Sequence, residues 1–343
     1  MKAIEISAPG QVQIVEREQP RPGMGELLLR IGYVGFCGSD LNTFRGLNPL
    51  VKLPVIPGHE IGATIEEAGA GVPAHLVPGL HVTVNPYTSC GHCRACRNGR
   101  PNACELNETL GVQRNGAMAS YMVLPWEKVL PGGDLPVCDL ALVEPMSVGF
   151  HAVNRGGVAR DEVVMVTGCG MIGLGAIVGA VARGARVVAV DVDDSKLALA
   201  RKLGAWHTLN SASTSLADGM REITDGMGAD VTIEAVGRGE TYLACVAETS
   251  FTGRMVCIGY AKERVPFETQ YFVKKELDIR GSRNATPPDF EAVMDYLTAH
   301  PHAASSFVSA VYPPEEAQQA LEFWNQNPGQ IFRILINFDK QLL

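Results

Sequence analysis

The sequence lacks an excess of basic residues. Its 343 residues include 29 lysines and arginines against 37 acidic residues, for a formal net charge of −8. This balance weighs against nucleic acid and anionic membranes as partners, because both demand a basic face. The segment from Met1 to Glu5 also lacks the apolar core of a signal peptide, so we expect a cytoplasmic protein. Internal repeats and low-complexity tracts are absent as well.

Long hydrophobic runs are scarce, and only the stretch from Val163 to Ala182 resembles a membrane span. It carries no charge, and its length matches the ~20 residues that a bilayer requires. Five glycines interrupt it, however, and β-branched residues crowd its first third. We interpret it as a buried strand that runs through a glycine turn into a buried helix, and we expect no membrane partner.

A chain of 343 residues is too long for one ordinary core, so two domains are expected. The first 145 residues contain short apolar segments separated by glycine and proline turns, which predicts a β-rich, barrel-like domain. Strand and helix patterns alternate between residues 162 and 280, which is typical of a doubly wound parallel sheet. Two helix-like segments follow, and the last strand-like segment is Ile331–Phe338.

Four of the nine cysteines lie within fifteen consecutive residues, in the spacing C-x2-C-x2-C-x7-C. They are Cys90, Cys93, Cys96 and Cys104. Four thiolates satisfy tetrahedral zinc with no open position, so we predict a structural zinc in a lobe of residues 88–106. Two disulfides or an iron–sulfur cluster are the alternatives, although cytosolic thiols stay reduced. His92 lies inside the cluster and is expected to be a bystander.

A glycine motif, G-x-G-x-x-G, runs from Gly168 to Gly173 between a predicted strand and a predicted helix. Gly168 permits a tight turn, Gly170 lets the backbone approach a pyrophosphate, and Gly173 lets helix and strand pack closely. Asp191 ends the next strand and is expected to bind the adenosine ribose. The acidic residues after it would repel a 2′-phosphate, which favours NAD over NADP. A structural turn in another α/β protein is the alternative. The other predicted cofactor-binding residues are Met171, Ile172 and Lys196.

A second set of metal-ligating residue types consists of Cys37, His59 and Glu60. One soft and two harder ligands fall short of a closed cage, and a catalytic zinc needs that open position for substrate or water. Taken singly, a buried cysteine usually serves packing, and a lone histidine is usually a satisfied polar group.

Five motifs together resemble the zinc-dependent medium-chain dehydrogenases, and they occur in that family's order. They are Gly35–Asp40, Pro57–Glu60, the four-cysteine lobe, Glu144–Gly149 and the glycine turn. The resemblance covers essentially the full length. It implies a GroES-like catalytic domain of residues 1–145 and 282–343 with a Rossmann NAD-binding domain, residues 146–281, inserted between its parts. It also implies two zinc ions per subunit and a homodimer or homotetramer.

The resemblance assigns roles to further residues. Glu144 corresponds to a metal ligand of the polyol and threonine dehydrogenase branch, where it alternates with the carboxylate equivalent to Glu60. Asp40 corresponds to the carboxylate that orients the metal-bound histidine. Ser39 resembles the hydroxyl that takes the substrate proton, while zinc lowers the pKa of the substrate alcohol before hydride transfer. Asn42 stands where many relatives carry a relay histidine, so proton release must run through water, Glu144 or another group.

The segment Gly281–Thr286 resembles bacterial sugar-acid dehydrogenases that oxidise L-galactonate or L-gulonate at C5. Arg283 and Asn284 are therefore predicted substrate residues, with Arg45 and Arg114 as further candidates that could equally form surface ion pairs. We hypothesise a small polyhydroxy substrate, an aldonate ahead of a polyol. A sorbitol, galactitol-phosphate or threonine dehydrogenase is the nearest alternative. A metal-free reductase or a non-catalytic nucleotide-binding relative would have no use for both sets of metal ligands.

Overall fold

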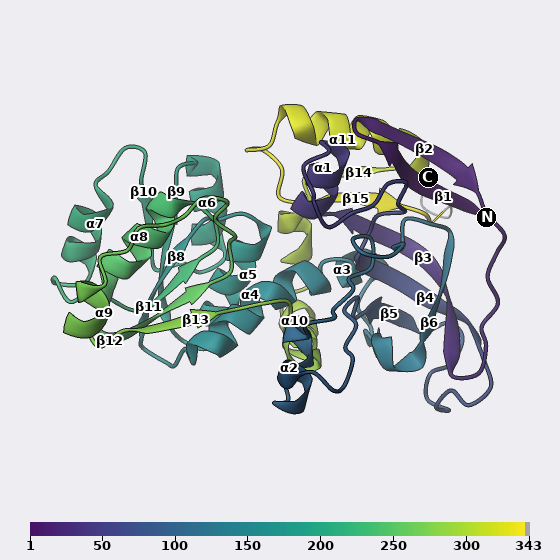
Figure 1. Cartoon of the computed structure of the whole chain (residues 1–343), viewed down its shortest axis with the longest axis horizontal. Helices are drawn as coiled ribbons and strands as arrows, with labels where there is room; N and C mark the ends of the chain where they lie inside the picture. The colour runs from purple at the N-terminus through teal and green to yellow at the C-terminus, as the bar shows by residue number, and fades with distance from the viewer. Residues whose placement is uncertain (340–343) are drawn as a thin grey trace. The chain divides into compact units, whose positions relative to one another are not determined.

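The computed structural model describes residues 1–339, which fold as two units (Figure 1). The first unit comprises residues 1–144 and the chain from Met294 onward, and the second comprises Pro145–Val293. The return to the first unit thus occurs inside helix α10 (Pro287–Ala299), later than the proposed residue 282. The start of α10 belongs to the second unit because Asp289 accepts a hydrogen bond of 2.8 Å from His151.

The first unit is β-rich. Its larger sheet has the strand order β14-β15-β3-β4-β5-β7, and β6 pairs with β3 in addition. These strands are β3 (Glu26–Phe36), β4 (Glu60–Ala68), β5 (His81–Val84), β6 (Tyr121–Pro125), β7 (Val129–Pro131), β14 (Ala310–Tyr312) and β15 (Ile334–Asn337). A separate antiparallel pair is formed by β1 (Lys2–Ala8) and β2 (Gln11–Glu16). Nine of the eleven residues of β3 and the first six residues of β4 are buried, so these two strands lie at the centre of the core.

Helices are short in the first unit and connect or cover the strands. They are α1 (Gly38–Phe44), α2 (Arg94–Arg97), α3 (Val137–Leu140), α11 (Ala317–Gln326) and the single-turn 3₁₀ segments η1 (Pro101–Ala103), η2 (Trp126–Lys128), η3 (Ala304–Phe307) and η4 (Pro314–Glu316). Helix α1 follows β3 directly and packs against α11 and β3. The chain therefore passes from the end of β3 at Phe36 into α1 at Gly38.

The second unit contains a parallel six-stranded sheet in the order β10-β9-β8-β11-β12-β13. The strands are β8 (Val163–Thr167), β9 (Arg186–Asp191), β10 (His207–Asn210), β11 (Ala229–Glu234), β12 (Thr249–Cys257) and β13 (Asp278–Gly281). The order reverses between β8 and β11, which is the position where doubly wound sheets bind ligands. The predicted doubly wound fold is confirmed.

Helices flank this sheet on both sides, with α5 and α8 on opposite sides of the strands in Figure 1. They are α4 (Val143–Gly156), α5 (Met171–Ala182), α6 (Asp194–Lys202), α7 (Leu216–Ile223), α8 (Gly239–Glu248) and α9 (Gln270–Lys274). The uncharged stretch that begins at Val163 forms β8, the glycine turn and α5. None of the helices within residues 1–339 combines the length and the apolar character needed to cross a bilayer.

Candidate metal centres and cofactor site

The antiparallel pairing of β3 and β4 brings the catalytic metal candidates together. Gly35 pairs with Glu60, so Cys37, just beyond the end of β3, lies beside His59 and Glu60 at the start of β4. The ligand atoms of Cys37, His59 and Glu60 all lie within 4.8 Å of one another. A Cβ atom at Gly35 would lie 2.1 Å from Glu60 Oε2. Only glycine at this position leaves room for the carboxylate.

Cys37 also serves as the N-cap of α1. Its Sγ accepts the N–H of Ser39 at 3.1 Å, and Asp40 Oδ2 accepts the N–H of Cys37 at 2.9 Å. This reciprocal capping box satisfies donors at the helix start and fixes the direction of the cysteine side chain. An N–H donated to sulfur also stabilises the thiolate, which is the form that binds a metal.

The buried acidic side chains of this cluster are not balanced by an equal number of positive charges. His59, Glu60 and Asp40 are 7%, 1% and 1% exposed. Burial raises the pKa of Glu60 to about 7, even though Arg333 opposes the shift. Asp40 Oδ1 and His59 Nδ1 are buried without a hydrogen-bond partner among the described residues. Buried acidic groups are costly without a partner, and a divalent cation supplies the missing charge, so the donor set fits zinc.

Two residues that the sequence analysis did not identify hold the carboxylates. Arg333 forms an ion pair with Glu60, with 3.0 Å between Nε and Oε2, and its Nη1 donates to the carbonyl of Phe36 at 2.8 Å. Tyr87 donates its hydroxyl to Glu144 Oε1. Glu144, in the first turn of α4, is therefore buried near the cluster but is not one of the three grouped ligands.

One of these residues carried a signal in the sequence. Arg333 is the only charged residue of the apolar segment Ile331–Phe338. A charged residue inside an apolar strand pattern is rarely buried without a partner. The segment therefore pointed to a buried acid, but nothing local identified Glu60 as that acid.

The four-cysteine lobe forms as a local structure. The sulfur atoms of Cys90, Cys93, Cys96 and Cys104 lie within 4.8 Å of one another. Backbone N–H groups point at three of them: Cys93 donates to Cys90 at 3.3 Å, Cys96 to Cys93 at 3.5 Å, and Cys90 to Cys104 at 3.3 Å. These donors stabilise thiolates, and four converging sulfurs match a closed tetrahedral zinc site. His92 is exposed and lies outside the group.

The glycine turn between β8 and α5 has the close approaches that the motif predicts. Gly168 has φ +88°. A Cβ atom at Gly173 would lie 1.7 Å from the Gly168 carbonyl oxygen, whereas one at Gly170 would meet nothing within 4 Å. Gly170 therefore faces open space at the start of a twelve-residue helix, where N–H groups and the helix dipole favour an anion. A dinucleotide pyrophosphate fits this cradle.

Asp191 lies at the end of β9, next to this turn. Its Oδ2 accepts the N–H of Cys169 at 2.7 Å, and its Oδ1 accepts the N–H of Val192 at 2.8 Å. The carboxylate thus joins β9 to the glycine turn. Lys196 lies in the first turn of α6, where its N–H donates to Asp193.

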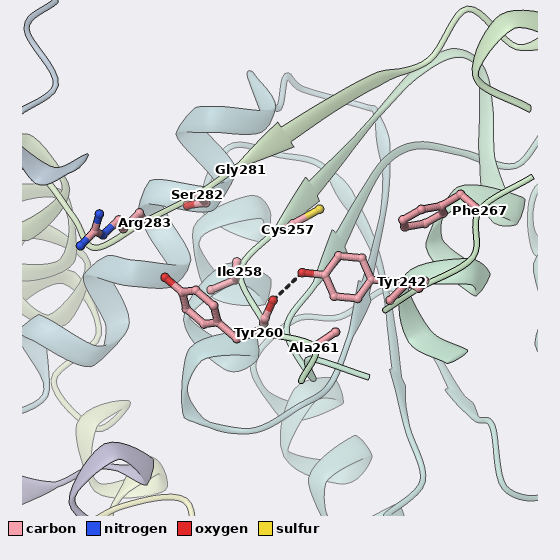
Figure 2. Close-up of a pocket in the computed structure, with 11 residues that line it drawn as sticks. Tyr242, Cys257, Ile258, Tyr260, Ala261, Phe267, Gly281, Ser282 and Arg283 are labelled. Atoms are coloured by element: carbon pink, nitrogen blue, oxygen red, sulfur yellow. Dashed lines mark hydrogen bonds between the residues drawn. The ribbon is translucent and has the colours of Figure 1, made fainter. Parts of the chain in front are cut away.

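The candidate substrate residues lie in different places. Arg283 and Asn284 follow β13 in the second unit, where Arg283 lines a pocket of 640 Å³ together with Tyr260 (Figure 2). Arg114 lines a pocket of 440 Å³ in the first unit. Arg45 instead donates to Asn325 on α11, with 2.6 Å between Nε and Oδ1.

Comparison with known proteins gives the family. The model of the alcohol dehydrogenase GroES-like domain matches residues 23–136, and the model of zinc-binding dehydrogenases matches residues 172–299. An L-galactonate-5-dehydrogenase of Escherichia coli (strain K12) is 33% identical over 338 residues, which cover 98% of this chain and 99% of that protein. The chain belongs to the zinc-dependent medium-chain alcohol dehydrogenase family.

Further relatives of this dehydrogenase extend over its length. A sorbitol dehydrogenase of Halalkalibacterium halodurans is 29% identical over 332 residues, covering 95% of this chain and 96% of the relative. The solved structure of the alcohol dehydrogenase RspB from E. coli CFT073, in complex with NADH, superposes with a TM-score of 0.91 at 28% identity. It covers 98% of this chain and 99% of RspB. The predictions of a GroES-like domain beside a Rossmann domain, of an oxidoreductase, and of zinc and NAD as cofactors are confirmed.

Proposed function

We propose that this dehydrogenase oxidises a secondary hydroxyl of a sugar acid, such as L-galactonate or L-gulonate, with NAD⁺ as the acceptor. The observation that carries the proposal is the buried group of Cys37, His59 and Glu60, with the Ser39 hydroxyl on the adjoining helical turn. A closed structural site would not need an open ligand position, whereas alcohol oxidation does.

Cys37, His59 and Glu60 are the proposed ligands of the catalytic zinc. When bound there, the ion polarises a substrate hydroxyl and lowers its pKa. Ser39 is the proposed acceptor of the hydroxyl proton. Asp40 is proposed to orient His59, because its Oδ1 is buried without a hydrogen-bond partner among the described residues.

Glu60 is proposed as the carboxylate ligand at rest, with Glu144 as its alternate. Glu60 belongs to the group of converging donor atoms, while one oxygen of Glu144 is engaged by Tyr87. Arg333 holds one oxygen of Glu60 in turn. Each carboxylate therefore has one protein partner that can receive it when the other binds the metal.

The proposed cofactor site comprises the glycine turn, the start of α5 and the end of β9. Its residues are Gly168, Gly170, Met171, Ile172, Gly173, Asp191 and Lys196. NAD, when bound, accepts the hydride from the substrate carbon. The turn would hold the pyrophosphate, and Asp191 with the acids beyond it would exclude a 2′-phosphate.

The substrate carboxylate is proposed to bind at Arg114. This side chain and Lys52 line the pocket of the first unit, and neither forms an ion pair within residues 1–339. Leu50, which lines the pocket, donates its N–H to Asn48, and Asn48 donates to Ser39. Asn115, which also lines the pocket, accepts the N–H of Ile56, three residues before His59. Two cations against one acid, Glu108, in the lining of this pocket suit an anionic substrate. Arg283 and Asn284 are retained as proposed contacts to the substrate hydroxyls.

A polyol substrate is the second candidate, because sorbitol dehydrogenases are as widely matched along the chain as the sugar-acid enzyme. We further propose a homodimer or homotetramer in the cytoplasm. Support for self-association comes from β13, an edge strand of the parallel sheet whose Ile279 is 46% exposed. Val273 and Tyr260 of the same unit are 85% and 80% exposed.

The test uses two substrates that differ only at one end. L-Gulonate and sorbitol carry the same hydroxyl stereochemistry, with a carboxylate in one and a hydroxymethyl group in the other. NADH formation is measured with both for the parent, for Arg114→Gln and for the control Arg45→Gln. Because a charge-assisted hydrogen bond contributes about 1.5–3 kcal/mol, Arg114→Gln should lower kcat/KM for L-gulonate by roughly 10–100-fold and leave sorbitol unchanged.

The outcomes separate the possibilities. A parent enzyme that oxidises sorbitol and galactitol but no aldonate supports the polyol alternative. Equal losses on both substrates in Arg114→Gln remove Arg114 from carboxylate binding. A zinc-replete parent that oxidises neither class refutes the proposed function.

A further inference from the structure

The side chain of Asn48 contacts the proposed proton acceptor. Asn48 Nδ2 donates to Ser39 Oγ at 3.0 Å and to Thr43 Oγ1 at 3.1 Å. Asn48 lies in the loop after α1, nine residues beyond Ser39, and it is half-buried. The sequence motifs gave no reason to single it out.

The orientation of this amide follows from its other bond. Asn48 Oδ1 accepts the N–H of Leu50 at 3.1 Å, and a backbone N–H can only donate. The NH₂ group must therefore face Ser39 and Thr43, and its two hydrogens match these two oxygens. Thr43 uses its own hydrogen on the Ser39 carbonyl, at 2.9 Å. The donors of Asn48 and Thr43 in this small network thus each have an acceptor.

This arrangement decides what the Ser39 hydroxyl has left to offer. A hydroxyl has one hydrogen and two lone pairs. Asn48 occupies one lone pair and, through its NH₂ group, cannot accept the hydroxyl hydrogen. The second lone pair of Ser39 Oγ is left for a substrate hydroxyl, and its hydrogen must point away from Asn48.

We propose that Asn48 is a positioning residue that sets the direction of proton transfer through Ser39. The proposal rests on the proposed oxidation of an alcohol. As the substrate O–H bond breaks, a new O–H bond forms at Ser39 Oγ, and the original Ser39 proton leaves to water. The hydride leaves the substrate carbon for NAD⁺ in the same turnover. The amide N–H also stabilises the negative charge that develops on Oγ while its proton departs. This route requires no ionisable side chain at position 42, where this chain has Asn42.

The test reverses the polarity of the contact. In Asn48→Asp, one carboxylate oxygen still accepts the Leu50 N–H, so the loop keeps its anchor, but the other oxygen accepts the Ser39 hydrogen. Because one lost hydrogen bond corresponds to about tenfold in rate, we expect kcat to fall by about tenfold or more with little change in KM. In a Ser39→Ala background, Asn48→Asp should cause no further loss, since its effect acts through Ser39. The matched control is Asn337→Asp, because Asn337 Oδ1 accepts the Asp339 N–H at 2.8 Å in the same local pattern and its side chain makes no hydrogen bond to Ser39.

Two further measurements keep the proposal open to refutation. Zinc content should be unchanged in Asn48→Asp, and the melting temperature should fall by only about 2–4 °C, because the hydrogen bond to Thr43 is lost. Neutron diffraction of the deuterated parent should place the Ser39 deuteron away from Asn48. An equal loss of rate in both backgrounds, or a deuteron that points at Asn48, overturns the proposal. A parent that oxidises no alcohol refutes the proposed function instead, and the neutron measurement still tests the network itself.

Discussion

Two alanine substitutions in the glycine turn should have different effects, one on stability and the other on cofactor binding. Gly173→Ala places a Cβ atom 1.7 Å from the Gly168 carbonyl oxygen, whereas Gly170→Ala meets nothing within 4 Å. Because non-bonded heavy atoms pack at about 3.5 Å, Gly173→Ala forces α5 and the turn apart by roughly 1.8 Å. The neighbouring atom is backbone, so no side chain can rotate out of the way.

The magnitude follows from two opposing contributions. Overpacking costs about 3 kcal/mol at the upper end of its usual range. Alanine is favoured over glycine within a helix by about 1 kcal/mol, which offsets part of this cost. The net loss of about 2 kcal/mol lowers the melting temperature by roughly 4–8 °C for a unit of this size. Gly170→Ala should shift the melting temperature little, but its methyl group occupies the cradle and should weaken NADH binding.

Thermal unfolding of the cofactor-free protein and NADH fluorescence titration measure the two effects separately. The expected result is a lower melting temperature for Gly173→Ala and a raised Kd with near-parental melting for Gly170→Ala. If Gly173→Ala were as stable as the parent, the helix and turn would not be packed as described. If Gly170→Ala bound NADH as tightly as the parent, the pyrophosphate would not lie over this residue.

Two further substitutions test buried charges. Asp289→Asn should destabilise the protein by about 2 kcal/mol, because hydrogen bonds from His151 and Thr286 to a carboxylate are lost. Burial would raise the pKa of Asp289, but these hydrogen bonds hold it below its usual value. The stabilisation by the Asp289 carboxylate is therefore complete above about pH 4 and is lost as the pH falls below that value. Urea unfolding should show this loss in the parent and not in the variant. Arg333→Met should cost about 3–5 kcal/mol in the metal-free protein by leaving Glu60 uncompensated. The loss should be smaller with zinc bound, and equal losses with and without a chelator would contradict the charge argument.

Local signals in the sequence predicted the cofactor unit well. As predicted, β8 begins at Val163 and runs to the glycine turn, and β9 ends at Asp191, because each strand is an apolar, β-branched run. The lobe was equally accessible, since the spacing of its cysteines is short enough to close within one local segment. By contrast, β2 was not predicted, because most of its side chains are exposed and its apolar alternation is weak.

The contacts that depend on long-range pairing were not predictable in this way. Arg333 meets Glu60 because β15 and β4 flank β3 on opposite sides, and no local pattern encodes that order. Tyr87 likewise reaches Glu144 from 57 residues away along the chain. Asn48 was overlooked because an asparagine in a loop usually indicates only a turn. These partners emerge once the register of the sheet is known.

The placement of the metal ligands at the end of β3 and the start of β4 has a consequence for the protein in a zinc-starved cell. An ion held by Cys37, His59 and Glu60 would link the two ends of the segment between β3 and β4, which contains α1 and the loop after it. By analogy with a disulfide across a loop of this length, such a link contributes about 3 kcal/mol. Enzyme made without zinc would therefore be a substrate for proteolysis as well as being inactive.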